Sequence, residues 1–138
     1  MRFLVMSHGP MAQGAVQSAE MILGQQEQVS ILSITVDSTI QSALQEIKET
    51  ITKYPDDQWV ILTDILGGTP FNASYRFLEE RPDIFIIAGF NLPILLETFM
   101  MAESSPEAIK EYIISHKESV ISLVEYATPS EEEEEFDL

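Results

Sequence analysis

Four short apolar runs, each followed by a segment whose apolar residues have helical spacing, limit the chain to a few folds. The runs are Phe3 to Met6, Val29 to Val36, Trp59 to Leu62 and Ile84 to Ala88. A run without polar residues, such as the first, is typical of a strand covered on both faces. Strand–helix alternation repeated four times predicts an α/β fold with a mostly parallel sheet and helices on both faces. We expect the strand order 2-1-3-4, in which strands 1 and 3 are neighbours.

Turn and capping residues indicate where the helices begin. Pro10 suits the first turn of the helix that follows the first run, and Ser38 or Thr39 suits the N-cap of the second helix. Thr69 is the expected N-cap of the third helix, with Pro70 at its first helical position. The first and third helices are therefore expected to begin close to the carboxyl ends of two predicted strands.

The C-terminal part of the chain divides into a predicted strand and a charged tail. Ser119 to Val124 has an alternating apolar and polar pattern and is predicted as a last, amphipathic strand. Residues 128–138 include five consecutive glutamates and are too charged to pack against a core. We therefore expect one folded domain over residues 1–127 and a disordered acidic tail over residues 128–138.

The charge balance of the chain argues against several classes of partner. The 138 residues carry a formal net charge of -16 at pH 7. Such an acidic chain is unsuited to nucleic acid or to anionic membranes, and it suits a partner with a basic face. The chain has no cysteine, which excludes disulfides and thiolate metal sites. With no signal-peptide core and no apolar stretch long enough to span a bilayer, a cytoplasmic location is expected.

A histidine follows the first apolar run, and an aspartate follows the third. His8 lies at the carboxyl end of the first predicted strand, and Asp64 lies at the carboxyl end of the third. In open parallel sheets, ligands bind beyond the carboxyl ends of the strands, where the strand order reverses. Because strands 1 and 3 are expected to be adjacent, His8 is predicted to lie within reach of Asp64. A carboxylate that accepts a hydrogen bond from one ring N–H fixes the tautomer and leaves the other nitrogen as a nucleophile.

Glycines and helix starts complete the predicted site. Gly9 and the Gly67–Gly68 turn are expected to leave backbone N–H groups free to approach an anion. Helices that begin near Pro10 and Thr69 would direct the positive ends of their dipoles to the same place. These features predict a phosphate site built without lysine or arginine. A nucleophilic histidine beside such a site indicates capture of a phosphoryl group.

Simpler explanations stay open for several of these residues. A lone histidine near a strand end is commonly a polar turn residue, and Asp64 has the alternative of a structural turn aspartate. The glycine pair is also consistent with a tight strand-to-helix turn. Asn72 in the third helix can bond either the loop or a ligand, and the sequence does not decide between them. His116 follows a predicted helix end, where a cation is favourable and no further role is needed.

Other functional classes lack their motifs. The chain has neither GxxxxGK[ST] nor a GxGxxG after a strand, so a P-loop kinase and a dinucleotide-binding protein are disfavoured. A response-regulator receiver would match Asp64, but it needs acidic metal ligands at the end of strand 1, where this chain has Met6, Ser7 and His8. A metal hydrolase needs a third ligand, and none is evident. We expect neither a metal nor a cofactor.

Long stretches of the chain resemble the IIA component of the mannose family of the bacterial sugar phosphotransferase system. The resemblance covers about residues 1–125, with its motifs in the same order. Its longest stretches are VMSHGPMAQG, SAEMILG, LTDILGGTPFNAS and IAGFNLPILLETFM.

This resemblance implies a cytoplasmic phosphocarrier. A phosphorylated HPr would transfer its phosphoryl group to Nε2 of His8, while Asp64 would bind Nδ1 and orient the ring. Gly67, Gly68 and Thr69 would line the phosphate pocket. The phosphoryl group would then pass to a histidine of a IIB partner and on to sugar entering through membrane subunits, so this chain would meet the membrane only indirectly.

The resemblance also implies a homodimer in which the last short strand is exchanged between subunits, and Ser119 to Val124 fits that strand. Some members of the family continue through a hinge rich in alanine and proline into a IIB domain. This sequence ends in acidic residues instead, so a stand-alone IIA is expected.

Two alternatives to this function remain. One is the phosphotransferase subunit of dihydroxyacetone kinase, which shares the fold and the histidine; the stretch NLPILLETFM favours the transporter family. The other is a non-catalytic interaction module of the same fold, and the presence of both His8 and Asp64 argues against it. Nothing in the sequence identifies the sugar or the IIB partner.

Overall fold

The computed structural model describes residues 1–127 and contains one parallel sheet of four strands. The strands pair in the order β2-β1-β3-β4, and all three pairings are parallel. The α/β fold and the strand order are therefore confirmed. The strands are β1 (Arg2–His8), β2 (Val29–Ile34), β3 (Trp59–Thr63) and β4 (Phe85–Ala88).

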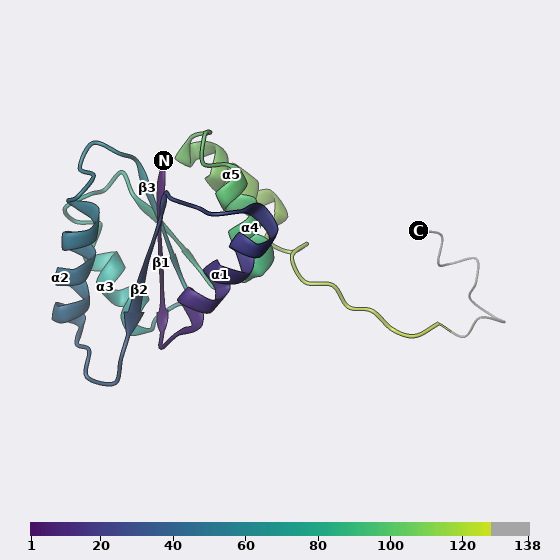
Figure 1. Cartoon of the computed structure of the whole chain (residues 1–138), viewed down its shortest axis with the longest axis horizontal. Helices are drawn as coiled ribbons and strands as arrows, with labels where there is room; N and C mark the ends of the chain where they lie inside the picture. Colours follow the sequence, from purple (N-terminus) through teal and green to yellow (C-terminus); the bar gives the residue numbers. More distant parts are fainter. Residues whose placement is uncertain (128–138) are drawn as a thin grey trace.

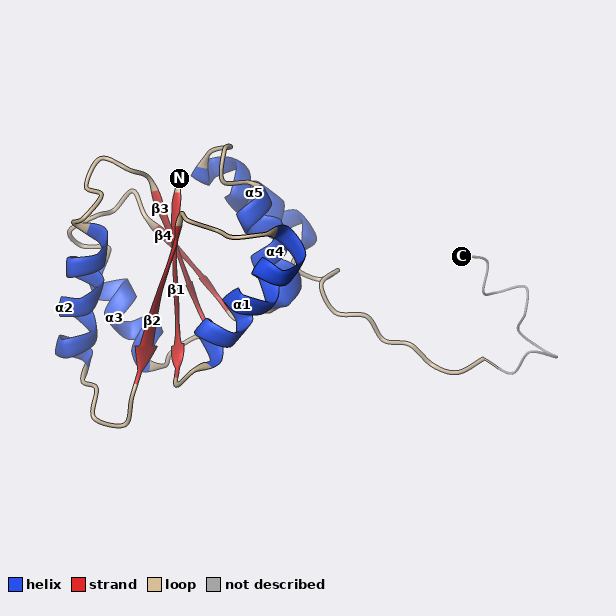
Figure 2. Ribbon diagram, viewed as in Figure 1, coloured by secondary structure: helices blue, strands red, loops and turns tan. Residues whose placement is uncertain are grey.

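Five helices cover the two faces of this sheet (Figure 1, Figure 2). One face is covered by α2 and α3, and the other by α1, α4 and α5. The helices are α1 (Met11–Leu23), α2 (Ile40–Ile51), α3 (Thr69–Phe77), α4 (Leu92–Met100) and α5 (Pro106–His116). No helix in residues 1–127 combines the length and the apolar character that crossing a membrane requires.

The central strand β1 supplies side chains to both layers of the core. Phe3 and Val5 pack with residues of α1, α4 and α5, while Leu4 and Met6 pack with residues of α2 and α3. Successive side chains of a strand point to opposite faces of the sheet, so a strand between two helical layers must be apolar at every position. This is why the first run of the sequence contains no polar residue.

The register of the sheet brings three strand ends to the same edge. Met6 of β1 pairs with Thr63, the last residue of β3, and His8 pairs with Ile34, the last residue of β2. The strands run in the same direction, so all four βα loops leave from this edge, which is the lower edge in Figure 1. We call it the carboxyl edge of the sheet.

The capping predictions have different outcomes for the two helices on the α2–α3 face. Of the two residues that the sequence offers, Ser38 and Thr39, it is Thr39 that forms the N-cap of α2, and it also makes a capping box with Ser42. The prediction for α3 is wrong by one residue. Gly68, not Thr69, is the N-cap, and Thr69 is the first helical residue, with Pro70 next. A glycine is accepted at this position because the cap needs only an extended backbone, which Gly68 adopts at φ -82 and ψ 174.

The predicted last strand does not form within the single chain. Residues 121–127 follow α5 without regular secondary structure, and Figure 1 shows them leading away from the body of the protein. A strand exists through hydrogen bonds to a neighbouring strand, so a segment directed away from its own sheet has no partner within residues 1–127. The predicted tail over residues 128–138 lies outside the described residues.

Candidate functional site

His8 and Asp64 are in direct contact at the carboxyl edge. Nδ1 of His8 lies 2.7 Å from Oδ2 of Asp64, and the backbone N–H of His8 donates to the same oxygen at 2.9 Å. The other carboxylate oxygen, Oδ1, accepts from the N–H of Ile65 at 3.0 Å. The two strand ends are therefore joined through one side chain, and the predicted proximity of His8 and Asp64 is confirmed.

The charge of Asp64 determines which ring nitrogen of His8 carries a proton. Burial raises the pKa of this carboxyl group, but the hydrogen bonds from His8 and Ile65 outweigh it, so the pKa lies below its ordinary value. Asp64 is therefore ionised at neutral pH and can only accept hydrogen bonds. Nδ1 of His8 must then be the donor, which leaves Nε2 of the neutral ring with a free lone pair.

The side chain of Asp64 is buried, whereas that of His8 is half-exposed. The side chain of Asp64 is 7% exposed and that of His8 is 49% exposed. The carboxylate is thus held away from solvent beneath the ring, where competing water does not weaken its hydrogen bonds. The imidazole itself is accessible to a reactant that arrives from outside.

Gly68 lies against the ring of His8. A Cβ atom at this position would be 2.7 Å from Cε1 and 3.3 Å from Nε2 of the imidazole. The backbone of Gly68 has a negative φ that any residue can adopt, so the need for glycine here is steric and not conformational. The absence of a side chain lets the ring rest on the turn that begins α3.

Asn72 holds the glycine turn in place. Its side-chain amide donates to the carbonyl oxygen of Gly67 at 3.0 Å, and its backbone N–H donates to the carbonyl of Gly68 at 2.8 Å. Gly67 has a φ of +88°, a conformation that favours glycine. The sequence left open whether Asn72 bonds the loop or a ligand, and in this structure it bonds the loop.

The N–H groups at the start of α3 have no partner within the described residues. No hydrogen bond formed inside residues 1–127 uses the N–H of Gly67, Gly68 or Thr69. The first N–H groups of a helix lack intrahelical acceptors, and the helix dipole makes them suitable for an anion. This arrangement beside Nε2 of His8 is compatible with a phosphate group.

The prediction of a free N–H at Gly9 is wrong. This N–H donates to the carbonyl oxygen of Ile34 at 2.8 Å, because the β1–β2 ladder continues one residue beyond His8. Gly9 instead contributes the turn, with a φ of +58°. In the described part of the chain, no three side chains of the metal-binding types gather into a site for an ion.

Ser7 is a structural residue of the site that the sequence reasoning missed. Its Oγ accepts a hydrogen bond from the N–H of Ala12 at 2.7 Å and donates to the carbonyl of Gly9 at 3.2 Å. Pro10 occupies the N-cap of α1 but has no side-chain acceptor, so Ser7 supplies the cap from the strand. The sequence does contain a signal for this role, because Ser7 stands three residues before Pro10, which begins the helix and lacks a side-chain acceptor.

The comparisons with known proteins identify the family of this chain. Residues 2–125 match the family described as "EIIA-man: PTS system fructose IIA component". The chain belongs to this family. The resemblance to the IIA components of the mannose type is thereby confirmed over nearly the whole described domain.

Curated relatives and solved structures support the same assignment. The mannose-specific EIIAB component of Escherichia coli is 30% identical over 132 residues, covering 90% of this chain and 41% of that protein. This EIIA chain thus spans about two fifths of that relative. The sorbose-specific EIIA component of Lacticaseibacillus casei is 28% identical and covered over its full length, with 99% of this chain aligned. The mannose/sorbose-specific IIA subunit of Enterococcus faecalis has the same fold, with a TM-score of 0.84 at 22% identity over 92% of this chain and 96% of that one.

The contact between Gly68 and His8 predicts the effect of adding one methyl group. Gly68→Ala should displace the imidazole and lengthen its hydrogen bond to Asp64, because the new Cβ would overlap Cε1. The ring ¹⁵N shifts of His8, measured by NMR, should change. Gly14→Ala is the control, since its Cβ would meet nothing within 4 Å. In that helix interior, alanine should stabilise the fold by about 0.5–1 kcal/mol. Unchanged ring shifts in Gly68→Ala would show that the ring does not rest on this turn.

Proposed function

We propose that this chain is a cytoplasmic phosphocarrier that accepts a phosphoryl group from phospho-HPr on Nε2 of His8 and transfers it to a IIB component. The observation that carries the proposal is the 2.7 Å contact between Nδ1 of His8 and Asp64, which leaves Nε2 as the nucleophile of a half-exposed side chain. Membership of the EIIA-man family supports the same role. An interaction module without catalysis would not need this charge-assisted pair.

The transfer step follows from the positions of these groups. The lone pair of His8 Nε2 attacks phosphorus, the N–P bond of the donor's phosphohistidine breaks, and the donor imidazole keeps the bonding electrons. The ring of His8 becomes positively charged while its Nδ1 proton stays in place. Asp64 would stabilise that charge, and the N–H groups of Gly67, Gly68 and Thr69 would donate to the phosphoryl oxygens.

The proposed acceptor residue predicts a single phosphorylation site. His8→Ala should abolish a phosphoryl label that is labile in acid and stable in base, because a phosphoramidate hydrolyses when its ring is protonated. His116→Ala is the matched control. This second histidine lies at the end of α5 and donates to the carbonyl of Tyr112, so the variant should label normally. Labelling would be measured with HPr, the general phosphotransferase enzyme and phosphoenolpyruvate. Full labelling of His8→Ala would exclude His8 as the acceptor.

The role of Asp64 predicts a loss of rate with retention of the fold. Asp64→Asn removes the carboxylate that holds the Nδ1 proton, and a hydrogen bond to a charged group is worth about 1.5–3 kcal/mol. The transfer rate from phospho-HPr, measured by rapid quench, should fall about tenfold or more. Asp37→Asn changes the net charge equally at the same edge and should leave the rate unchanged. Equal rates in the two variants would reduce Asp64 to a structural turn residue.

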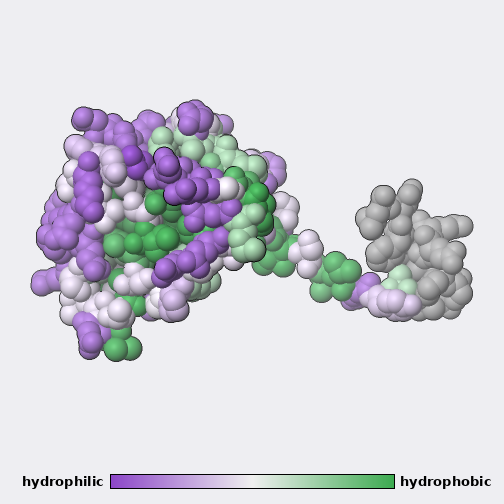
Figure 3. All heavy atoms as spheres, in the orientation of Figure 1, coloured by the Kyte–Doolittle hydropathy of each residue, from purple (hydrophilic) through white to green (hydrophobic). Residues whose placement is uncertain are grey.

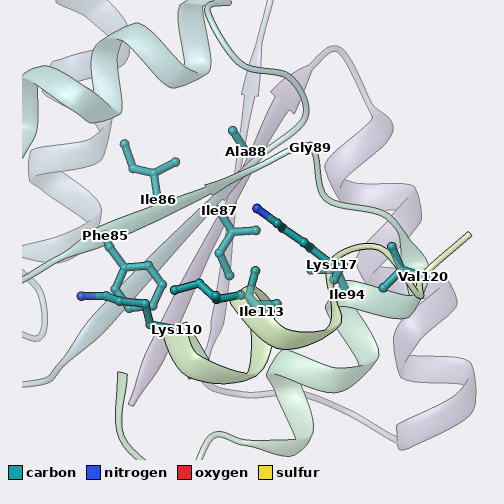
Figure 4. Close-up of a pocket in the computed structure, with 11 residues that line it drawn as sticks. Phe85, Ile86, Ile87, Ala88, Gly89, Ile94, Lys110, Ile113, Lys117 and Val120 are labelled. Atoms are coloured by element: carbon teal, nitrogen blue, oxygen red, sulfur yellow. The ribbon is translucent and has the colours of Figure 1, made fainter. Parts of the chain in front are cut away.

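We also propose that the chain is a homodimer joined by exchange of the segment Ser119 to Val124. Within residues 1–127 no strand pairs with the outer edge of β4, and a groove of about 390 Å³ lies between this edge and α5 (Figure 4). Its lining is mostly apolar and includes Ile87, Ile94 and Ile113. The neighbouring Ile121 and Leu123 are exposed in the single chain, with 79% and 88% of their surface accessible. An added strand from a second copy would cover the groove and pair the free edge.

The exchanged segment predicts different association states for two truncated chains. A chain ending at residue 118 should be monomeric by light scattering, because it lacks the strand that would pair with β4. A chain ending at residue 127 should remain dimeric, since it loses only the acidic tail. A dimeric 1–118 protein, or a monomeric full-length chain at micromolar concentration, would contradict strand exchange.

A further inference from the structure

The proposed phosphate site depends on backbone N–H groups, because the loops around it supply no cation. The loops that follow the four strands contain no lysine or arginine, and their charged residues are Asp37 and Asp64. In Figure 3 the tip of the loop between β2 and α2, at the lower edge of the molecule, carries hydrophobic atoms. A phosphoryl group on His8 would therefore be held by backbone dipoles, so the direction of each N–H matters.

The start of α3 offers fewer N–H donors than an ordinary helix start. Pro70, the second residue of the helix, has no N–H, so the site depends on the N–H groups of Gly67, Gly68 and Thr69. Gly68 lies next to the nucleophile, since a Cβ at this residue would be 3.3 Å from Nε2 of His8. The orientation of the peptide between Gly67 and Gly68 therefore decides whether one N–H faces an anion on Nε2 or turns away from it.

A peptide between two glycines turns over more easily than any other. Neither Gly67 nor Gly68 has a side chain to hinder the rotation, and glycine adopts positive and negative φ about equally well. In a planar trans peptide the C=O and the N–H point in opposite directions. If this peptide turned over, the carbonyl oxygen of Gly67 would take the place of the N–H of Gly68, and it would repel the phosphoryl oxygens.

The side chain of Asn72 holds this peptide in one orientation. Its amide donates to the carbonyl oxygen of Gly67 at 3.0 Å, while its backbone N–H donates to the carbonyl of Gly68 at 2.8 Å. With the carbonyl of Gly67 bound to Asn72, the N–H of Gly68 must point away from Asn72. Asparagine is a poor helix former, so helix propensity does not account for an exposed asparagine at this position of α3.

We infer that Asn72 is a positioning residue for the phosphoryl group, because it keeps the N–H of Gly68 directed at the oxygens bound to Nε2 of His8. This inference rests on the proposed function and adds a residue that acts through the backbone. The hydrogen bond from Asn72 to Gly67 exists before the phosphoryl group arrives. The donors are therefore oriented in advance, and transfer does not have to supply the free energy of turning the peptide.

The test removes the hydrogen bond to Gly67 and keeps the helix. In Asn72→Ala the higher helix propensity of alanine offsets the lost bond, so urea unfolding should give nearly the same free energy as in the unmodified chain. The equilibrium constant for phosphoryl transfer from phospho-HPr should fall by a factor of about three to five, because the peptide has the right orientation for only part of the time. The phosphorylated fractions of HPr and of this chain would be measured by ³¹P NMR.

Two further measurements separate orientation of the backbone from contact with a partner. Labelling of His8 by phosphoramidate, a small donor without a protein surface, should slow by a similar factor in Asn72→Ala. Phosphorylation should shift the amide proton resonance of Gly68 strongly in the unmodified chain and less in Asn72→Ala. An equal shift in the two proteins would reduce Asn72 to a structural residue and overturn the inference.

A matched control removes another asparagine at the same edge of the sheet. Asn91 is the N-cap of α4, and its Oδ1 accepts from the N–H of Ile94 at 3.0 Å. Asn91→Ala should lose stability, because alanine is a poor N-cap, and should keep the transfer equilibrium of the unmodified chain. An equal fall of the equilibrium constant in this control would show a general effect of loosened helix starts and would overturn the role of Asn72.

The remaining outcomes separate the role of Asn72 from the function itself. An unchanged equilibrium constant in Asn72→Ala would overturn the positioning role and leave the phosphocarrier function standing. A loss with phospho-HPr that is absent with phosphoramidate would place Asn72 in a contact with the donor protein and would also overturn it. Failure of the unmodified chain to accept a phosphoryl group from phospho-HPr would contradict the proposed function, and the positioning role would fall with it.

Discussion

The parallel pairing of β1 with β3 is the constraint on which the site depends. Their backbone pairing ends at Met6 and Thr63, and the carboxylate of Asp64 then accepts the next N–H, that of His8. One side chain thus continues the ladder and also binds the ring through Nδ1. Because the same oxygen accepts both hydrogen bonds, the position of the imidazole is tied to the strand register, and a shift of register would separate the pair.

Much of the fold could be predicted, and so could the contact between His8 and Asp64. Both depend on the order of apolar runs and helical segments along the whole chain. Apolar runs separated by helical spacing specify an α/β sheet, and the common strand order makes the ends of β1 and β3 neighbours. His8 and Asp64 follow from that placement alone. The N-cap of α2 could be narrowed to Ser38 or Thr39, because hydroxyl side chains before a helical run are a local signal, but the capping box with Ser42 lacks the usual Glu or Gln and has no such signature.

The details that the sequence did not predict are hydrogen bonds between turns and side chains. Whether the N–H of Gly9 is free depends on how far the β1–β2 ladder extends, and residue types do not encode that length. Ser7 and Asn72 act on the backbone of Gly9 and Gly67, whose positive φ values orient the carbonyl groups that they bind. The predicted C-terminal strand differs in kind, because a strand needs a neighbouring strand to pair with, and residues 121–127 have none within the described part of the chain.

The scarcity of fixed charge at the carboxyl edge has a consequence for how a carrier signals its state. A phosphoryl group on a histidine brings close to two negative charges. The loops that follow the four strands contain two charged residues, Asp37 and the covered Asp64, so Asp37 is the exposed one. A loaded subunit would therefore differ from an empty one mainly in local electrostatic potential, within the roughly 10 Å over which charges act at moderate salt. Partners could distinguish the phosphorylated form from the unphosphorylated form without any rearrangement of the backbone. The phosphoryl group itself would then be the feature that they recognise.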